Sequence, residues 1–570
     1  MARWRRRAEE GSVLVVTALA LVALLGATAF SVDMGRETVV KRHLQGTADA
    51  AAADARFGLC DLSSAKGLAS ASFGRNHYVP SSPLAAEISL GTAGTTAGVE
   101  TFSPSSDPPS CTATTSSSPA VQVKVSQTVS NLFASGSSTP SATGTWVSTP
   151  LTGVRVGSYL AAAGHDPAGL PVGGLLGALL GSGSLQAVSY DGLANADVTL
   201  GQLTTALKAG TTSQALSTQI SYADLLSAMV AALTANSKDP GAEAAISVLG
   251  TIQAALPVYL PHTLTLGQLL SVADPGRAAV ADASVDVWDL VTGGAEIANG
   301  QHFLTVPGFK ATVPNLLAGL PVGVTNPKLV SVTASLAAIQ PPQTAYGPVG
   351  TSAHTAQVVA QAEAKITADI GLGPLSVVAV TLDVPVTVVG AAATSTVQAI
   401  TCDGANRSEG GVAIDTSATT AAAYLGKVTS LDSSGQPVVQ PAQVASLSVL
   451  GVTAGLSGSA SVDLSQPDQA MTFTGPFSNG LRGPQALSKP STNLSFNLSS
   501  LHGTGVLSIL TPVLSLLDPA VNLLAANLSS ALAPLLEAAG VQVGGADVYN
   551  LAYPGAASPG GVDCLAGHVF

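Results

Sequence analysis

The sequence predicts an α+β protein that begins with a membrane-spanning helix. Ser12 to Val32 is a run of 21 residues without a charge, long enough at about 1.5 Å per residue to cross a bilayer core of about 30 Å. Residues 33–58 keep a helical pattern in a polar, alanine-rich form. Helix-capping patterns follow in 151–327 and β-type alternation in 328–475. We therefore expect a transmembrane helix that continues as a juxtamembrane helix, and then a mixed extracellular region of helical units and antiparallel sheet.

The changes in composition along the chain predict its domain organisation. The predicted segments are a basic tail (1–11), the transmembrane helix (12–32), the juxtamembrane helix (33–58), a small Ser/Thr/Pro-rich β module (59–150), helix-rich repeated units (151–327), an antiparallel β region (328–475), and a Gly/Pro linker with amphipathic helices and a C-terminal tail (476–570).

The apolar run also satisfies the pattern of a cleaved signal peptide. A basic segment precedes it, and Ala27-Thr28-Ala29 has the small residues of a cleavage site. We favour an uncleaved anchor because the apolar run continues through Phe30 and Val32 into a further helix. Cleavage after Ala29 stays open, and a mature protein that starts at Phe30 would exclude the anchor.

The charge balance bears on both partners and orientation. Charged residues make up 10% of the chain and the formal net charge is -12. Nucleic-acid binding needs clustered Lys and Arg, and the cluster from Arg3 to Arg7 lies before the apolar run, so we expect no nucleic-acid partner. The positive-inside rule places the N-terminus in the cytoplasm, although Arg36, Lys41 and Arg42 reduce the bias.

The cysteine pattern fits an oxidising exterior. The four cysteines are Cys60, Cys111, Cys402 and Cys564, and an even number in a Ser/Thr-rich background favours disulfides. Of the three possible pairings we favour Cys60 with Cys111, which share the 59–150 module, and Cys402 with Cys564. Unpaired buried thiols are the alternative. We expect a single-pass plasma-membrane protein, anchored through Ser12 to Val32, with its bulk outside the cell.

The helix after the apolar run resembles a known family. Val32-Asp33-Met34-Gly35-Arg36, Lys41 to Gln45 and Thr47 to Ala52 are similar to the N-terminal segment of the TadE/TadG-like proteins of Flp (Tad) pilus assembly. The resemblance implies a role in pilus assembly or anchoring, with pilus-assembly or envelope proteins as partners. It marks as residues of the family-motif helix Asp33, Gly35, Arg36, Leu44, Gln45, Ala48 and Asp49.

Two features of such relatives are not carried over to this chain. Pilin-like relatives are cleaved after a glycine and have a glutamate five residues later, whereas the position after Gly11 that corresponds is Val16. Some larger relatives have a von Willebrand type A domain with a D-x-S-x-S metal motif, and the stretch from Asp432 to Gln436 lacks the second serine.

The 59–150 module and the following repeats show different patterns. Val121 to Val129 alternates as a half-buried strand does, while Ser103–Pro119 and Ser135–Pro150 are predicted to be loops or linker. Beyond residue 154 a local unit recurs, in which Thr, Ser or Asp stands three residues before Gln or Asp. This is the spacing of a capping box, so each unit predicts an extended segment that turns into a helix. The units are residues 198–203, 220–225, 264–269 and 285–290.

The C-terminal half changes to strands and then to an apolar segment. Alternation predicts antiparallel strands at 329–336, 361–370, 377–389, 391–401 and 446–465. Residues 506–536 are strongly apolar but are interrupted by prolines and Asp518, which favours a buried amphipathic helix over a membrane span. The turn-rich tail from Tyr553 to Phe570 is expected to be held by Cys564.

The sequence predicts no enzyme, no cofactor and no metal site. The scattered histidines form neither a helical pair nor a Cys/His ligand spacing. They are His43, His77, His165, His262, His302, His354, His502 and His568. Gly455 to Ser459 comes close to a nucleophile elbow but has Ser459 where glycine is required. His354 is expected to be a hydrogen-bonding turn residue, with a site residue as the alternative.

The predicted function follows from the resemblance and the anchor together. We expect a membrane-anchored, surface-exposed component of Flp-type pilus assembly that acts by packing its Asp33–Ala55 helix beside similar helices and by protein contacts. One alternative is a cell-surface adhesion or structural protein. Another is an extracellular module that binds a hydrophobic ligand or lipid, which the Leu-rich segments and the positive mean hydropathy suggest.

Overall fold

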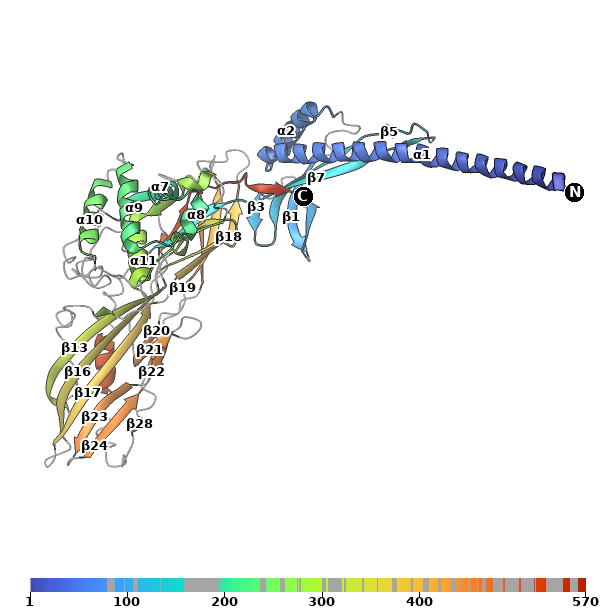
Figure 1. Cartoon of the computed structure of the whole chain (residues 1–570). Coiled ribbons are helices and arrows are strands. Elements are labelled where there is room, and N and C mark those ends of the chain that lie inside the picture. Colours follow the sequence, from blue (N-terminus) through green and yellow to red (C-terminus); the bar gives the residue numbers. More distant parts are fainter. Residues whose placement is uncertain are drawn as a thin grey trace. The chain divides into compact units, whose positions relative to one another are not determined.

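The structure is a computed structural model of the chain (Figure 1). It describes residues 2–78, 88–96, 98–105, 111–133, 135–157, 193, 196–235, 242–256, 262–273, 275, 278–299, 304–305, 320–321, 324–340, 343–355, 357–371, 377–390, 393–402, 410–418, 422–431, 437–440, 442–449, 452–458, 460–463, 468–474, 485–486, 502–503, 517, 519–528, 547–553 and 562–570.

The chain forms two compact units, each assembled from separate segments. The first unit consists of Met1–Leu151, Ala399–Gly411 and Ser558–Phe570. The second unit consists of Thr152–Gln398 and Val412–Ala557. Two later segments of the chain, Ala399–Gly411 and Ser558–Phe570, thus return to the first unit.

The first unit begins with one uninterrupted helix. α1 (Ala2–Ala55) joins the predicted transmembrane and juxtamembrane helices, and it is followed by η1 (Arg56–Gly58) and α2 (Leu62–Arg75). Val13–Gly58 is long and apolar enough to cross a membrane, and it is the one such helix among the described residues. The predicted N-terminal helix is thus confirmed.

An antiparallel sheet packs against α2 and against the C-terminal end of α1 (Figure 1). The strand order is β2 (Val99–Pro104), β1 (Ile88–Thr96), β4 (Ser118–Ser126), β7 (Ser141–Ser148) and β30 (Gly567–Val569). β4 alternates as predicted and buries Val121, Val123 and Val125. The short strands are β3 (Thr112–Thr114), β5 (Val129–Ser130) and β6 (Ser137–Ser138).

The prediction of a loop over residues 135–150 was wrong, because this stretch contains β7, an interior strand of the sheet. Its hydroxyl side chains do not mark a linker: Thr145 and Ser148 are buried beside Trp146. Small residues are suited to a strand that a helix backbone approaches closely, since they leave room for it. The 103–119 stretch likewise contains the end of β2, all of β3 and the start of β4.

The helical part of the second unit has the capping that the repeats predict. Thr199 and Gln202 form a capping box ahead of α7, and Thr265 and Gln268 form one ahead of η3. Ser221 and Asp224 exchange the corresponding bonds ahead of α9, and Asp286 accepts from two amides of α11. The elements are β9 (Asp197–Thr199), α7 (Leu200–Ala206), α8 (Thr212–Ser217), α9 (Tyr222–Ala235), α10 (Ala242–Ala254), η3 (Leu266–Gln268), β10 (Leu270–Val272), η4 (Ala278–Asp282), β11 (Ser284–Asp286) and α11 (Val287–Asn299).

The extended parts of the repeats pair with one another. Val198 lies opposite Val285 in the antiparallel pair of β9 and β11, and Ile220 lies opposite Leu264. The first residues of the repeats thus form two antiparallel pairs. The repeat at residues 264–269 does not continue into an α-helix as expected, because after η3 the chain enters β10, which pairs in parallel with β14 (Thr344–Gly347).

The largest sheet of the second unit is antiparallel and has one polar face, as predicted. β16 buries Ala362, Ala364, Ile366 and Ala368, while Lys365 is exposed. The described strands of this sheet are β12 (Leu304–Thr305), β13 (Val324–Gln340), β16 (Gln357–Gly371), β17 (Val377–Gly390), β23 (Ala442–Val449), β24 (Val452–Gly458) and β28 (His502–Gly503), with β20 (Ala422–Leu425) beside β17 and β25 (Ala460–Asp463) beside β20.

The remaining strands form smaller sheets. The strand predicted at 391–401 is β18, and it pairs with β15 and β19 rather than with the largest sheet. The other strands are β8 (Thr152–Gly157), β15 (Ser352–His354), β18 (Ala393–Thr401), β19 (Gly411–Ala418), β21 (Lys427–Leu431), β22 (Pro437–Gln440), β26 (Gln469–Thr474), β27 (Gln485–Ala486) and β29 (Asp547–Leu551).

The apolar segment near the C-terminus contains a buried helix, as predicted. Pro519–Leu528 is helical, and its apolar face is buried through Val521, Leu524 and Leu528. Leu532, Leu535, most of the linker at 476–490, the stretch from Asp432 to Gln436, and Ser459 lie outside the described residues.

Candidate functional site at the N-terminal helix

α1 changes its environment between His43 and Leu44. Most described side chains before that point are exposed, whereas one face of the helix is buried afterwards. The buried positions follow helical spacing, so they form a single stripe. The stripe consists of Leu44, Thr47, Ala48, Ala51, Ala52 and Ala55.

A glycine in the sheet allows α1 to lie directly on β7. A Cβ atom added at Gly144 would lie 2.6 Å from the backbone carbon of Ala48 and 2.7 Å from the backbone nitrogen of Asp49. Any side chain at residue 144 would therefore push the helix away from the strand. Alanine on the helix and glycine on the strand permit this close approach, as small residues do wherever backbones pack closely.

The predicted family-motif residues in the second half of α1 hold the helix against the sheet. Leu44 and Ala48 are fully buried in the core of the first unit. Gln45 donates from Nε2 to the carbonyl oxygen of Thr143 at 3.0 Å and to Oδ1 of Asp49 at 2.8 Å. Their positions in the fold account for an apolar pair at 44 and 48 and a polar pair at 45 and 49.

The motif residues nearest the apolar run contact the β5–β6 hairpin and not the five-stranded sheet. Asp33 accepts hydrogen bonds from the backbone N–H groups of Leu132 at 2.8 Å and Phe133 at 3.2 Å. Arg36 donates to the carbonyl oxygen of Ser130 at 3.3 Å. No pattern in the sequence predicts these backbone contacts. At Gly35 an added Cβ would meet nothing within 4 Å.

The end of α1 is fixed by polar contacts to α2 and by a cation–π contact to β7. Asp54 forms an ion pair with Arg75 of α2. The Arg56 guanidinium lies 4.9 Å from the ring centroid of Trp146. Asp61 caps α2, and hydrogen bonds from Ser64 and Ser63 lower the pKa of its carboxyl group.

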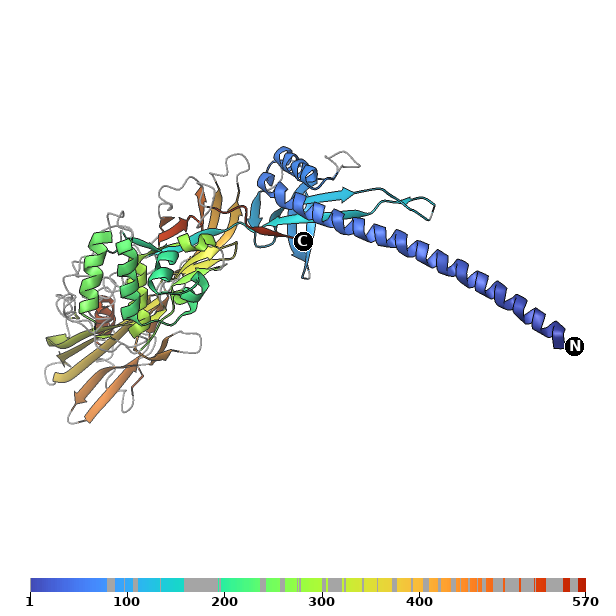
Figure 2. The ribbon, with the colours of Figure 1, turned by 45° about the horizontal axis from the view of Figure 1, so that its top comes forward.

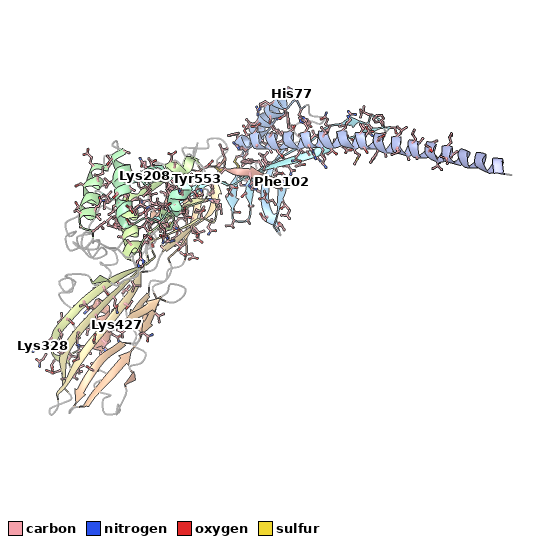
Figure 3. All side chains as sticks on the ribbon, viewed as in Figure 1. His77, Phe102, Lys208, Lys328, Lys427 and Tyr553 are labelled. Atoms are coloured by element: carbon pink, nitrogen blue, oxygen red, sulfur yellow. A yellow bond between two sulfur atoms is a disulfide. The ribbon has the colours of Figure 1, made fainter. Side chains whose placement is uncertain are left out.

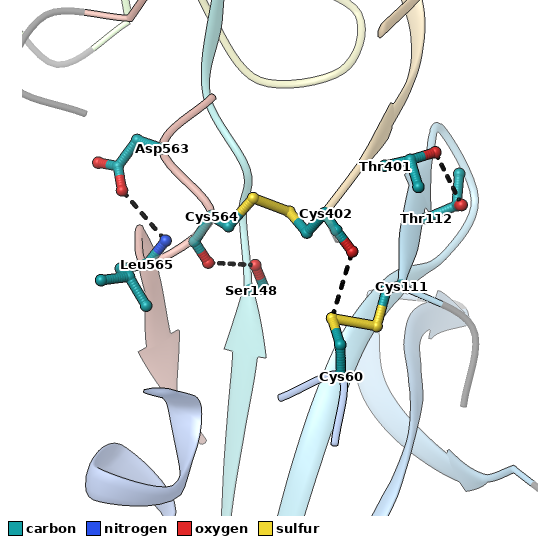
Figure 4. The surroundings of a disulfide bond; sticks show 9 residues. All are labelled: Cys60, Cys111, Thr112, Ser148, Thr401, Cys402, Asp563, Cys564 and Leu565. Carbon is teal, nitrogen blue, oxygen red and sulfur yellow. Dashed lines mark hydrogen bonds between the residues drawn. A yellow bond between two sulfur atoms is a disulfide. The ribbon is translucent and has the colours of Figure 1, made fainter. Parts of the chain in front are cut away.

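The disulfides are Cys60–Cys111 and Cys402–Cys564 (Figure 4), the pairing favoured from the sequence. The two bridges adjoin, because the backbone N–H of Cys402 donates to the carbonyl oxygen of Cys111 at 2.8 Å. Ser148 at the end of β7 donates to the carbonyl oxygen of Cys564 at 3.1 Å. The Cys402–Cys564 bridge therefore joins the two returning segments to each other, and these hydrogen bonds connect them to the rest of the first unit.

The C-terminal tail completes the sheet on which α1 lies. β30 pairs with β7, and His568 lies opposite Val147. The backbone groups of Thr145 and Phe570 exchange hydrogen bonds of 3.2 and 2.9 Å. Nε2 of His568 lies 3.0 Å from the carboxylate oxygens of Glu100. In the sequence, only Cys564 indicated that the C-terminal tail is held in place, and it did not predict the strand β30.

A buried charge cluster in the second unit was not predicted. Nε of Arg155 lies 2.8 Å from Oδ2 of Asp289, and its Nη2 lies 3.3 Å from Oδ2 of Asp286. The guanidinium also stands 5.4 Å from the ring centroid of Tyr549. Burial raises the pKa of Asp286 to about 8, against the opposing charge of Arg155, and burial followed by the charge of Asp289 raises the pKa of Glu296. The cluster joins β8 to the start of α11.

A second charged group joins β16 and β17 of the largest sheet to β21. Lys427, labelled in Figure 3, places Nζ 2.6 Å from Oε2 of Glu363. Burial, and then the hydrogen bond and charge of Glu363, raises the pKa of Asp383 to about 6. His354 is a strand residue of β15 and not a turn residue; burial lowers its pKa. Among the described residues, no group of three or more His, Cys, Asp or Glu side chains could hold a metal ion.

Comparison with known proteins connects the N-terminal helix to one family. Residues 11–56 match the family model described as "Putative Flp pilus-assembly TadE/G-like". Residues 11–56 are a TadE/G-like segment. This segment ends one residue after α1 and contains every family-motif residue named from the sequence. No curated protein matches the chain, and no solved structure matches it.

Proposed function

We propose that the protein is a single-pass membrane component of Flp-type pilus assembly or anchoring, with a cytoplasmic N-terminus and its bulk outside the cell. The TadE/G-like segment supports the link to the pilus, and the apolar run supports the anchor. The two disulfides support an exterior location, because disulfides persist in oxidising compartments.

One observation supports this proposal most directly: the anchor and the core of the first unit share one helix. α1 runs from the apolar segment to the buried stripe without a break. A domain mounted in this way follows the tilt and rotation of its membrane helix, unlike a domain on a flexible linker. The TadE/G-like segment would thus hold a folded unit at a fixed place beside the membrane.

We also propose which surface of α1 packs beside similar helices of partner proteins. The alanine stripe from Leu44 to Ala55 is covered by the sheet and α2 of the same chain. Packing beside similar helices would therefore use the opposite face or the exposed stretch before Leu44, where Val39 is 66% exposed. A photo-crosslinking amino acid at residue 39 should capture envelope or pilus proteins, whereas one at Val99 should not. Equal capture at both positions would contradict this mode.

The anchor is tested by placing charges in the apolar run. In Leu21→Arg/Leu24→Arg, two arginines at the centre of a span cost about 5 kcal/mol or more on insertion scales, so the protein should leave the membrane fraction. Leu21→Ile/Leu24→Ile is the matched control and should stay there. Retention of the arginine variant would contradict the anchor, and intact-mass measurement of the membrane form would show whether cleavage after Ala29 occurs.

The link to pili is tested in cells that assemble them. Deleting the gene should abolish or reduce pilus assembly, and the full-length chain should restore it. The arginine variant should fail to restore assembly, while the isoleucine control should succeed. Unchanged pilus assembly in the deletion strain would contradict the proposed function.

A further inference from the structure

The hairpin of β5 and β6 follows α1 from the core of the first unit back to Asp33, at the C-terminal end of the apolar run. Ala48 lies against Gly144 in β7, and Gln45 bonds to the adjacent Thr143. Nearer the N-terminus of α1, Arg36 bonds to Ser130 and Asp33 to Leu132. The contacts move toward lower residue numbers on α1 as they move toward the hairpin. The hairpin runs beside the helix in Figure 1, and Figure 2 shows it extending from the same end of the sheet.

The hairpin presents two large apolar side chains to the exterior. Leu132 is 61% exposed and Phe133 is 66% exposed. They follow β5, whose residues Val129 and Ser130 pair with Ser138 and Ser137 of β6. The sequence contains no charged residue between Lys124 and Arg155. Exposed apolar side chains on a hairpin without charges are typical of a surface that contacts something apolar.

The position of Leu132 and Phe133 along the axis of α1 indicates what these side chains contact. Their backbone N–H groups bond to Asp33, the residue directly after the apolar run. On the helix itself Phe30 is 65% exposed and Val32 is 45% exposed. The apolar side chains of the hairpin therefore lie at the level on α1 where the apolar run ends, which the proposed anchor places at the edge of the bilayer core.

We propose that Leu132 and Phe133 insert into the membrane leaflet nearest the first unit, as a second lipid contact beside α1. This inference rests on the proposed membrane anchor. Asp33 is the positioning residue: its carboxylate holds the two N–H groups that would otherwise need a partner at the interface. Two contacts would fix the rotation of the first unit about the axis of α1, which a single helix leaves free.

The test uses tryptophan fluorescence in the full-length protein reconstituted into phosphatidylcholine vesicles, with and without bromine on the lipid acyl chains. Phe133→Trp reports on the hairpin. Val99→Trp is the matched control, because Val99 is 63% exposed at the start of β2, in the β1–β2 hairpin of the same unit. Val22→Trp reports on the span. The unmodified protein supplies the background of its three tryptophans.

Brominated lipid should quench Phe133→Trp several-fold more than Val99→Trp, and it should quench Val22→Trp strongly. If Val22→Trp is quenched while Phe133→Trp behaves like Val99→Trp, the hairpin insertion is wrong and the anchor stands. If Val22→Trp is not quenched, both the anchor and the insertion are wrong.

Asp33→Ala in the Phe133→Trp background tests the positioning role. Removing the carboxylate should reduce the quenching of the hairpin tryptophan while leaving that of Val22→Trp unchanged. Glu37→Ala in the same background is the control, since Glu37 is a partly buried acidic residue one turn further along α1. Equal quenching with and without Asp33 would overturn its assignment as the positioning residue.

Discussion

The two halves of α1 differ in a way that reverses the usual relation between apolar character and burial. The half up to Val32 has the large apolar side chains, yet Leu24 is 66% exposed. The half from Leu44 is mostly alanine, yet Leu44 itself is 0% exposed. Large side chains suit a lipid surrounding, and small ones suit contact with a sheet whose backbone comes close. The exposed half thus has the side chains that the proposed membrane anchor requires, and the alanine-rich half has those that packing on the sheet requires.

The largest expected effect compares the same substitution in the two halves. Leu44→Ala should lower the stability of the first unit by about 3 kcal/mol, because removing a fully buried leucine side chain leaves a cavity. Leu24→Ala should leave that stability unchanged, since the side chain makes no contribution to the protein core. Amide hydrogen exchange of β4 in the detergent-solubilised protein measures the change, and β16 in the second unit is the internal reference. Equal losses in both variants would contradict the division of α1.

A smaller effect is expected where the helix approaches the sheet. Gly144→Ala should cost the first unit about 2 kcal/mol, because the new Cβ would overlap the backbone of Ala48 and force the helix outward. Gly35→Ala should cost nothing, as its Cβ would meet no atom within 4 Å. The same exchange measurement applies. A tolerated alanine at residue 144 would mean that α1 does not lie on β7 as closely as the structure has it.

The features of the fold that could be predicted from sequence are those set by nearby residues. The long helix follows from its composition, the capping of α7 from Thr199 and Gln202, and the strand β16 from strict alternation. Each depends on a period or a spacing within a few residues. The disulfide pairing was favoured because Cys60 and Cys111 share a segment, which is also a local argument.

The features that could not be predicted depend on contacts between distant residues. Ser and Thr in β7 have the composition of a linker, and only the neighbouring α1 makes a strand of small residues favourable there. The backbone amides that bond to Asp33 have no signature in the sequence. The return of β30 and the burial of Arg155 beside Asp289 likewise depend on long-range pairing, which a single sequence does not encode as a pattern.

The second unit offers a polar version of the same contrast: a buried carboxyl group whose protonation changes with pH. Glu296 is a charged residue type, yet it is only 5% exposed, and burial raises its pKa well above 4.5. Because the folded state favours the protonated form, its contribution to stability is fully present below pH 4.5 and is lost as the pH rises toward the raised value. Glu296→Gln should therefore stabilise the second unit at pH 7 and flatten this dependence.

Urea unfolding between pH 4.5 and pH 7, followed by exchange of the amides of α11, measures the effect of Glu296→Gln. Glu243→Gln is the matched control, because Glu243 is exposed in the first turn of α10. A stability that falls equally with pH in both variants would show that Glu296 is not the group responsible.

The smallest expected effect separates folding from partner binding within the TadE/G-like segment. Gln45→Ala removes the bonds to Thr143 and Asp49 from an exposed position, and alanine is the better helix former, so the first unit should lose only about 0.5 kcal/mol. Arg42→Ala, on the exposed stretch one turn earlier, is the control. If Gln45→Ala abolishes pilus assembly with so small a loss of stability, the side chain acts on a partner. If assembly survives, its bond to the sheet accounts for its place in the motif, and the partner surface lies elsewhere on the helix.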